Sequence, residues 1–171
     1  MKSTPLLPTE YNSYFKGYLD KVTTTSLMDS LQLGLDRTVA LFESIPPERE
    51  DYRYKEGKWT PRDILQHIID TERVFTYRAL QFARGTDVVL QGFDQNEFAA
   101  NSCANSRTLE DMLVEYRSVR KSTLQFAKSC SQDILVRRGV VGDSPLSVRA
   151  ALYIVCGHEI HHCEIIRERY L

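Results

Sequence analysis

Apolar residues recur at helical spacing in four long stretches of this sequence, and each stretch starts at a residue that caps helices well. The second stretch is the clearest. Thr60 suits the cap, Pro61 fits the first helical position, and Asp63 suits the positive helix end. Gly85 offers a left-handed exit after Arg84. Similar signals predict long helices at residues 26–45, 60–84, 108–128 and 147–170.

The segments between these helices carry few strand signals. Aromatic residues at helical spacing predict a short helix at residues 10–22, and Val140-Val141 predicts a brief extended stretch. Residues 86–107, rich in Asp, Asn and Gln, are predicted to form a long loop of the kind that often carries function. We therefore expect an all-α four-helix bundle with a short N-terminal helix, as one domain over residues 1–171. The polar connector at residues 48–58 is long enough for a topology other than simple up-and-down.

Charge and composition exclude several classes of protein. The net charge of −1 provides no electrostatic attraction to nucleic acid or to an anionic membrane. No run approaches the ~20 apolar residues of a membrane span, and the N-terminus lacks the apolar core of a signal peptide. Free thiols in a reducing cytoplasm are the simplest interpretation of four cysteines without a C-x-x-C pair, Cys103, Cys130, Cys156 and Cys163. We expect a cytoplasmic protein whose partner is a small molecule.

The four histidines form the most informative pattern. His158 and His162 are four residues apart, so on a helix their Cβ atoms lie about 5–6 Å apart on one face. Two imidazoles placed in this way can bind one metal ion, and His67, on the inward face of the second long helix, can supply a third ligand. His161 is rotated away from both. The alternative is that these histidines are structural, with ordinary hydrogen bonds.

Three histidine ligands would leave coordination positions open for water or substrate, which is typical of catalytic metal sites. Residues 158–162 also spell H-E-x-x-H, the zinc-peptidase signature with the glutamate as general base. We give this interpretation less weight, because no following helix supplies the usual downstream acidic ligand. Glu159 and Asp70 are weak candidates for a catalytic carboxylate.

Several other residues are expected to lie near the site. Arg73 and Arg78 are candidates for binding an anionic substrate group, although pairing with acids is their simpler role. Residues 92–96 are a candidate pocket wall, with Asp94 or Gln95 available for hydrogen bonds. Trp59 is expected to staple its helix to the core.

The sequence resembles the DinB/YfiT-like family of metal-dependent proteins over most of its length. The resemblance rests on the order and spacing of short motifs: KWTPRDILQHIIDTER at 58–73, YRAL at 77–80, FDQ at 93–95, GHEIHH at 157–162 and RERYL at 167–171. It implies a four-helix bundle with a nickel or zinc ion on His67, His158 and His162. It also implies a homodimer. Some relatives transfer low-molecular-weight thiols such as bacillithiol or mycothiol, or isomerise substrates through them.

Three functional hypotheses follow. The first is a metal-dependent enzyme acting on a small molecule, either a hydrolase or a low-molecular-weight thiol S-transferase. The second is a non-catalytic metal-binding or stress-associated protein. The third is a zinc peptidase, for which Glu159 would be essential and His67 dispensable.

Overall fold

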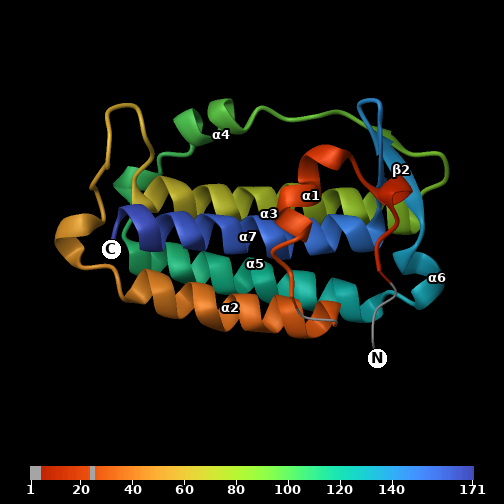
Figure 1. The fold of residues 1–171 in the computed structure, drawn as a ribbon, viewed down its shortest axis with the longest axis horizontal. Helices are drawn as coiled ribbons and strands as arrows, with labels where there is room; N and C mark the ends of the chain where they lie inside the picture. The colour runs from red at the N-terminus through yellow and green to blue at the C-terminus, as the bar shows by residue number, and fades with distance from the viewer. Residues whose placement is uncertain (1–4, 24–25) are drawn as a thin grey trace.

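The four long helices begin where the sequence places their caps, in a computed structural model that describes residues 5–23 and 26–171 (Figure 1). The helices are α2 (Leu27–Glu43), α3 (Pro61–Arg84), α5 (Leu109–Ser129) and α7 (Val148–Arg169). Thr60 and Asp63 form a reciprocal capping box at α3: Thr60 Oγ1 accepts from the Asp63 amide at 3.1 Å, and Asp63 Oδ2 accepts from the Thr60 amide at 2.9 Å. The all-α bundle predicted from the sequence is confirmed.

The order of the helices around the bundle differs from their order in the chain. Both α2 and α3 pack against α5 and α7, so α2 and α3 occupy opposite corners. Figure 1 shows α3 and α5 running in the same direction. The connection between them must therefore return along the bundle, which at 1.5 Å per residue is roughly 36 Å for a helix the length of α3.

That return segment contains short elements rather than the uninterrupted loop predicted at 86–107. It forms strand β1 (Val89–Leu90), helix α4 (Gln95–Asn101) and a 3₁₀ turn, η4 (Ala104–Ser106). Asp94 caps α4 by accepting from the amides of Asn96 at 2.8 Å and Glu97 at 3.3 Å. Such local hydrogen bonds stabilise one turn of helix without any long-range periodic pattern, which is why periodicity did not reveal it.

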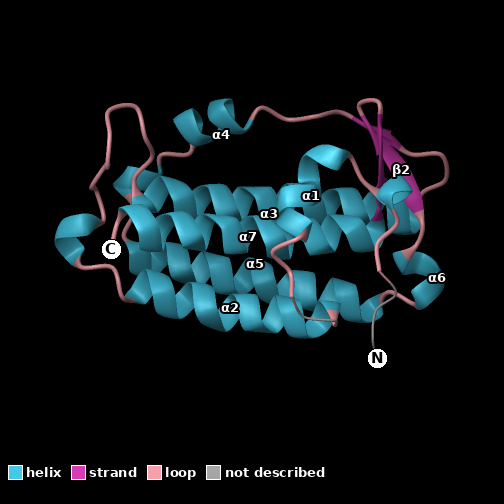
Figure 2. Cartoon of the chain, in the orientation of Figure 1, coloured by secondary structure: helices cyan, strands magenta, loops and turns pink. Residues whose placement is uncertain are grey.

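A small sheet closes one end of the bundle (Figure 2). Strand β1 pairs in parallel with β2 (Arg138–Val141), and β2 pairs antiparallel with β3 (Ser144–Ser147). The extended stretch predicted at Val140-Val141 is confirmed. Gly142, with φ of +59°, makes the tight turn between β2 and β3. Helix α6 (Gln132–Leu135) precedes the sheet.

The N-terminal segment is shorter in helix than predicted. In place of a helix at 10–22, the chain forms 3₁₀ turns η1 (Pro8–Glu10) and η2 (Ser13–Phe15), then α1 (Lys16–Leu19). Glu10 is held by long-range contacts, because its carboxylate accepts from Ser147 Oγ at 2.8 Å and from Arg149 Nε at 2.7 Å. Helix α1 then lies on α7 at Gly157, where a Cβ atom would overlap the backbone carbonyl of Tyr18.

Two apolar clusters fill the bundle, one toward each end, and buried polar residues lie between them. On α3 the buried residues of one cluster are Ile64, Leu65, Ile68 and Ile69, and those of the other are Phe75, Ala79, Phe82 and Ala83. Thr71 and Glu72 are buried between the two sets. On α7 the buried residues between the clusters include His158, Glu159 and His162.

The connector between α2 and α3 includes the 3₁₀ turn η3 (Pro47–Arg49). Among the described residues, no helix is both long enough and apolar enough to span a bilayer.

Candidate metal centre

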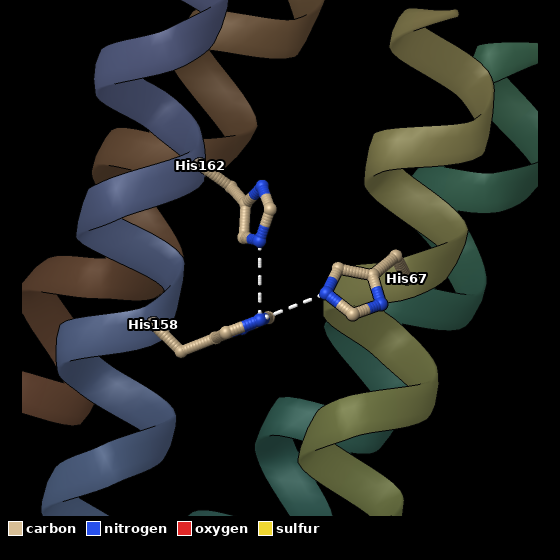
Figure 3. A group of neighbouring side chains, drawn as sticks. All are labelled: His67, His158 and His162. Carbon is tan, nitrogen blue, oxygen red and sulfur yellow. Dashed lines mark hydrogen bonds between the residues drawn. The ribbon is translucent and has the colours of Figure 1, made fainter. Parts of the chain in front are cut away.

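Three histidine side chains meet in the polar middle of the bundle, His67 from α3 and His158 and His162 from α7 (Figure 3). The Nε2 atom of His158 lies 2.9 Å from Nε2 of His67 and 3.1 Å from Nε2 of His162. One nitrogen atom of each ring can serve as a ligand, and these three nitrogen atoms all lie within 4.8 Å of one another. All three side chains are buried. The structure thus brings together the residues that the sequence pattern singled out.

Two features bring the three histidines together: the periodicity of α7 and the packing of α3 against α7. The four-residue spacing places His158 and His162 on one face of α7. Contact between α3 and α7 then brings His67 opposite them. His161, on the same turn, is directed elsewhere: its ring centroid lies 5.3 Å from that of Tyr18, and it is not a member of the group.

Apolar and aromatic surroundings keep these imidazoles neutral. The Trp59 ring centroid lies 4.8 Å from that of His67, and the Tyr18 ring centroid lies 5.5 Å from that of His158. Burial lowers the pKa of His67 to about 4, and burial together with the neighbouring imidazoles lowers the pKa of His162 to about 3. Burial likewise lowers the pKa of His158. Neutral imidazole nitrogens are the form that binds zinc or nickel, so this donor set fits a divalent ion.

Metal-depleted protein is expected to lose stability as the pH falls from about 7 to about 5. An unfolded histidine takes up a proton near pH 6.5, whereas His67 and His162 in the fold resist it down to about 4 and about 3. The unfolded state therefore binds more protons in this window, and each histidine lowers the unfolding free energy by up to about 1.4 kcal/mol per pH unit. Urea unfolding in chelator measures the slope. A His162→Phe variant should show a shallower slope, and equal slopes in variant and wild type would contradict the assignment.

Glu159 belongs to a different buried cluster. Its carboxylate accepts from Arg120 Nη1 at 3.1 Å and Nη2 at 3.0 Å, and the Tyr116 hydroxyl donates to it. Arg120 also donates from Nε and Nη2 to Glu72, at 2.9 Å for each bond, and from Nη1 to the Leu31 carbonyl at 2.9 Å. These bonds hold the carboxylate toward α5, which does not suit the general base of a peptidase.

The sequence interpretation did not find this cluster, although one signal was present. Arg120 follows Tyr116 by four residues on the inward stripe of its helix, where an arginine is out of place unless it is paired. Asp70, the other catalytic candidate, accepts from Gln66 Nε2 at 3.0 Å and lies 3.6 Å from Arg73. Burial raises the pKa of Asp70, but its carboxylate contacts Gln66 and Arg73 rather than a histidine.

Two cavities flank the histidines. One, of about 350 Å³, is lined by His158 together with residues of α1, α3 and the β2–β3 hairpin. The other, of about 300 Å³, is lined by His162 and Trp59. The prediction of a pocket wall at 92–96 is confirmed, because Gly92, Phe93 and Gln95 line the first cavity. Asp94 does not line it and caps α4 instead.

The four cysteines are free thiols, as predicted. Burial raises the pKa of both Cys156 and Cys163 to about 12. Neither thiol is a member of the histidine group.

Comparisons with known sequences and structures identify the family of this chain. A search of curated protein sequences finds no significant match. YfiT from Bacillus subtilis, described as a probable metal-dependent hydrolase with an unusual four-helix bundle topology, is a similar solved structure. The two share 15% identity with a TM-score of 0.74, over 83% of this chain and 82% of that one. The DinB superfamily model matches residues 30–166, a span that includes all three clustered histidines. This chain therefore belongs to the DinB superfamily.

Proposed function

We propose that this protein is a metal-dependent enzyme that holds one divalent ion on His67, His158 and His162 and hydrolyses a small molecule. The observation that carries the proposal is the meeting of three buried, neutral imidazoles beside a cavity of about 350 Å³. A divalent ion held by three protein ligands supplies a Lewis acid and lowers the pKa of a water molecule bound to it.

The remaining residues suit a reaction shielded from bulk water. Trp59 covers the His67 ring, and Tyr18 packs edge-on against His158. The cavity beside His158 has mainly apolar walls, and its volume falls in the range of small-molecule sites. A closed structural site would adjoin no such cavity, which favours an enzyme over a non-catalytic metal-binding protein. The likeness to YfiT supports hydrolysis in particular.

A second candidate function is transfer of a low-molecular-weight thiol. The observation in its favour is the second cavity, on the side of His162, since a thiol cosubstrate and an acceptor need separate approaches to one centre. Imidazole ligands suit both nickel and zinc, the two ions that we propose. A cytoplasmic location and a homodimer also remain proposals, and sedimentation analysis of the purified protein tests the latter.

The test is an activity screen of metal-depleted protein reloaded separately with zinc, nickel or manganese. Hydrolysis of ester and amide panels, and conjugation of thiols to an electrophile such as monochlorobimane, should appear only in loaded protein. His158→Ala should remove the activity and His161→Ala should retain it. Stoichiometric metal binding without turnover in either panel would contradict the enzyme proposal and favour a non-catalytic metal-binding protein.

A further inference from the structure

We propose that the cavity beside His158 binds a small carboxylate, whose acid group pairs with the guanidinium of Arg78 and whose apolar body lies against aromatic rings. This inference deepens the proposed function, on which it rests only for the reacting end of the molecule. The acid subsite itself is argued from Arg78 and its neighbours.

Arg78 is buried without a counter-charge. Its side chain on α3 is 6% exposed and forms no ion pair with any carboxylate in residues 5–23 and 26–171. Its single hydrogen bond among the described residues is a long one, 3.4 Å from Nη2 to the Gln91 carbonyl. Burial lowers the pKa of Arg78 from its usual 12.5, but an arginine still carries its charge at neutral pH.

A comparison within the same bundle shows how unusual this is. Arg120, the fully buried arginine of α5, is neutralised by Glu72 and Glu159. Because a buried charge is costly unless it is paired, an anion would stabilise Arg78, whereas Arg120 already has its carboxylate partners. The cavity is where that anion can enter, since Arg78 lines its wall.

The charge of the cavity wall selects the kind of anion. Arg78 is the one side chain with a formal charge among the residues that line the cavity, since His158 is neutral. One positive charge complements a monoanion, which favours a carboxylate over a phosphate dianion. The guanidinium fork also matches a carboxylate in two parallel hydrogen bonds.

The other side chains of the cavity wall indicate the chemical character of the rest of the ligand. The guanidinium carbon lies 4.8 Å from the ring centroid of Phe75 and 5.5 Å from that of Phe93. Phe15, also in the wall, meets Phe75 edge to face with centroids 5.5 Å apart. These rings favour an apolar or aromatic body next to the acid group.

Thr71 marks a polar position between the acid subsite and the histidines. Its hydroxyl is buried, lines the cavity and has no hydrogen-bond partner among the described residues. Thr71 lies one helical turn from His67 and two turns from Arg78. Eleven residues of helix separate His67 from Arg78, about 16 Å, and a helical arginine side chain points back toward the N-terminus. Because Arg78 and His158 both line this cavity, a small molecule bound in it can lie against both side chains.

The experiment compares 4-phenylbutyrate with its neutral amide, 4-phenylbutanamide, by NMR titration of metal-depleted protein. We expect the carboxylate to bind about 10- to 100-fold more tightly than the amide, as for a charge-assisted hydrogen bond. Arg78→Gln should remove this preference, while Arg84→Gln, an exposed arginine near the end of the same helix, should retain it. Thr71→Val should leave the preference between acid and amide unchanged.

Metal-depleted protein separates this inference from the proposed function, because acid binding at Arg78 does not need the ion. Equal affinity for acid and amide, absence of binding by either probe, or an unchanged preference in Arg78→Gln would overturn the subsite. If Arg78→Gln fails to fold, the Nε–Hε signal of Arg78 in the wild type decides. That signal should shift on titration with the carboxylate and not with the amide, and the opposite result rejects the proposal.

Discussion

Replacing His67 with alanine is expected to remove the metal ion from this protein, although His67 lies 91 residues before His158 in the chain. Wild-type protein purified without chelator should carry about one nickel or zinc ion per chain, the expectation for one three-histidine site. The variant should lose most of it, because even supporting residues outside the ligand set change metal affinity by 10- to 100-fold and a ligand matters more. Elemental mass spectrometry of the purified chains measures the content.

Two further variants make this result specific. His158→Ala should lose the ion as well, whereas His161→Ala, on the same turn but outside the cluster, should keep it. Retention of the ion in His67→Ala would instead favour the peptidase interpretation, in which His67 is dispensable. A wild-type chain that takes up no stoichiometric zinc, nickel or manganese would contradict the metal site altogether.

Arg120→Met is expected to lower the free energy of unfolding by about 3–5 kcal/mol, the usual cost of removing one partner from a buried ion pair. The side chain is 0% exposed and bonded to Glu72 and Glu159, so its loss leaves two carboxylates without their cation. Urea unfolding of metal-depleted protein measures the change without the contribution of a bound ion.

The matched control is Arg117→Met, one turn earlier on α5. Arg117 pairs with Glu43 at 2.5 Å on the exposed surface, so this variant should change stability by less than about 1 kcal/mol. Combining Arg120→Met with Glu72→Gln and Glu159→Gln should recover part of the loss, because the uncompensated charges are then gone. A similar small loss in Arg117→Met and Arg120→Met would show that the buried cluster is not a structural element.

Local sequence determined the helices and the shared face of two of the three histidines in the candidate site. A cap, a proline and an apolar stripe act within one or two turns, so Thr60 and Asp63 start α3 wherever that helix lies. The spacing of His158 and His162 likewise sets their shared face by the pitch of a single helix. These features need no knowledge of the remaining chain, and the structure confirms them.

Tertiary structure alone decided which faces meet. The polar contacts of Glu10 with Ser147 and Arg149 join residues more than 130 positions apart, and they shortened the predicted N-terminal helix. Glu159 follows His158 directly, yet its partners Tyr116 and Arg120 both lie on α5, as helix rotation and the unusual helix order dictate. Among the described residues no carboxylate pairs with Arg78 for the same reason, because a counter-charge lies there only if the packing of another element brings one. Short-range rules cannot supply that information, since it depends on the packing of segments that are distant in sequence.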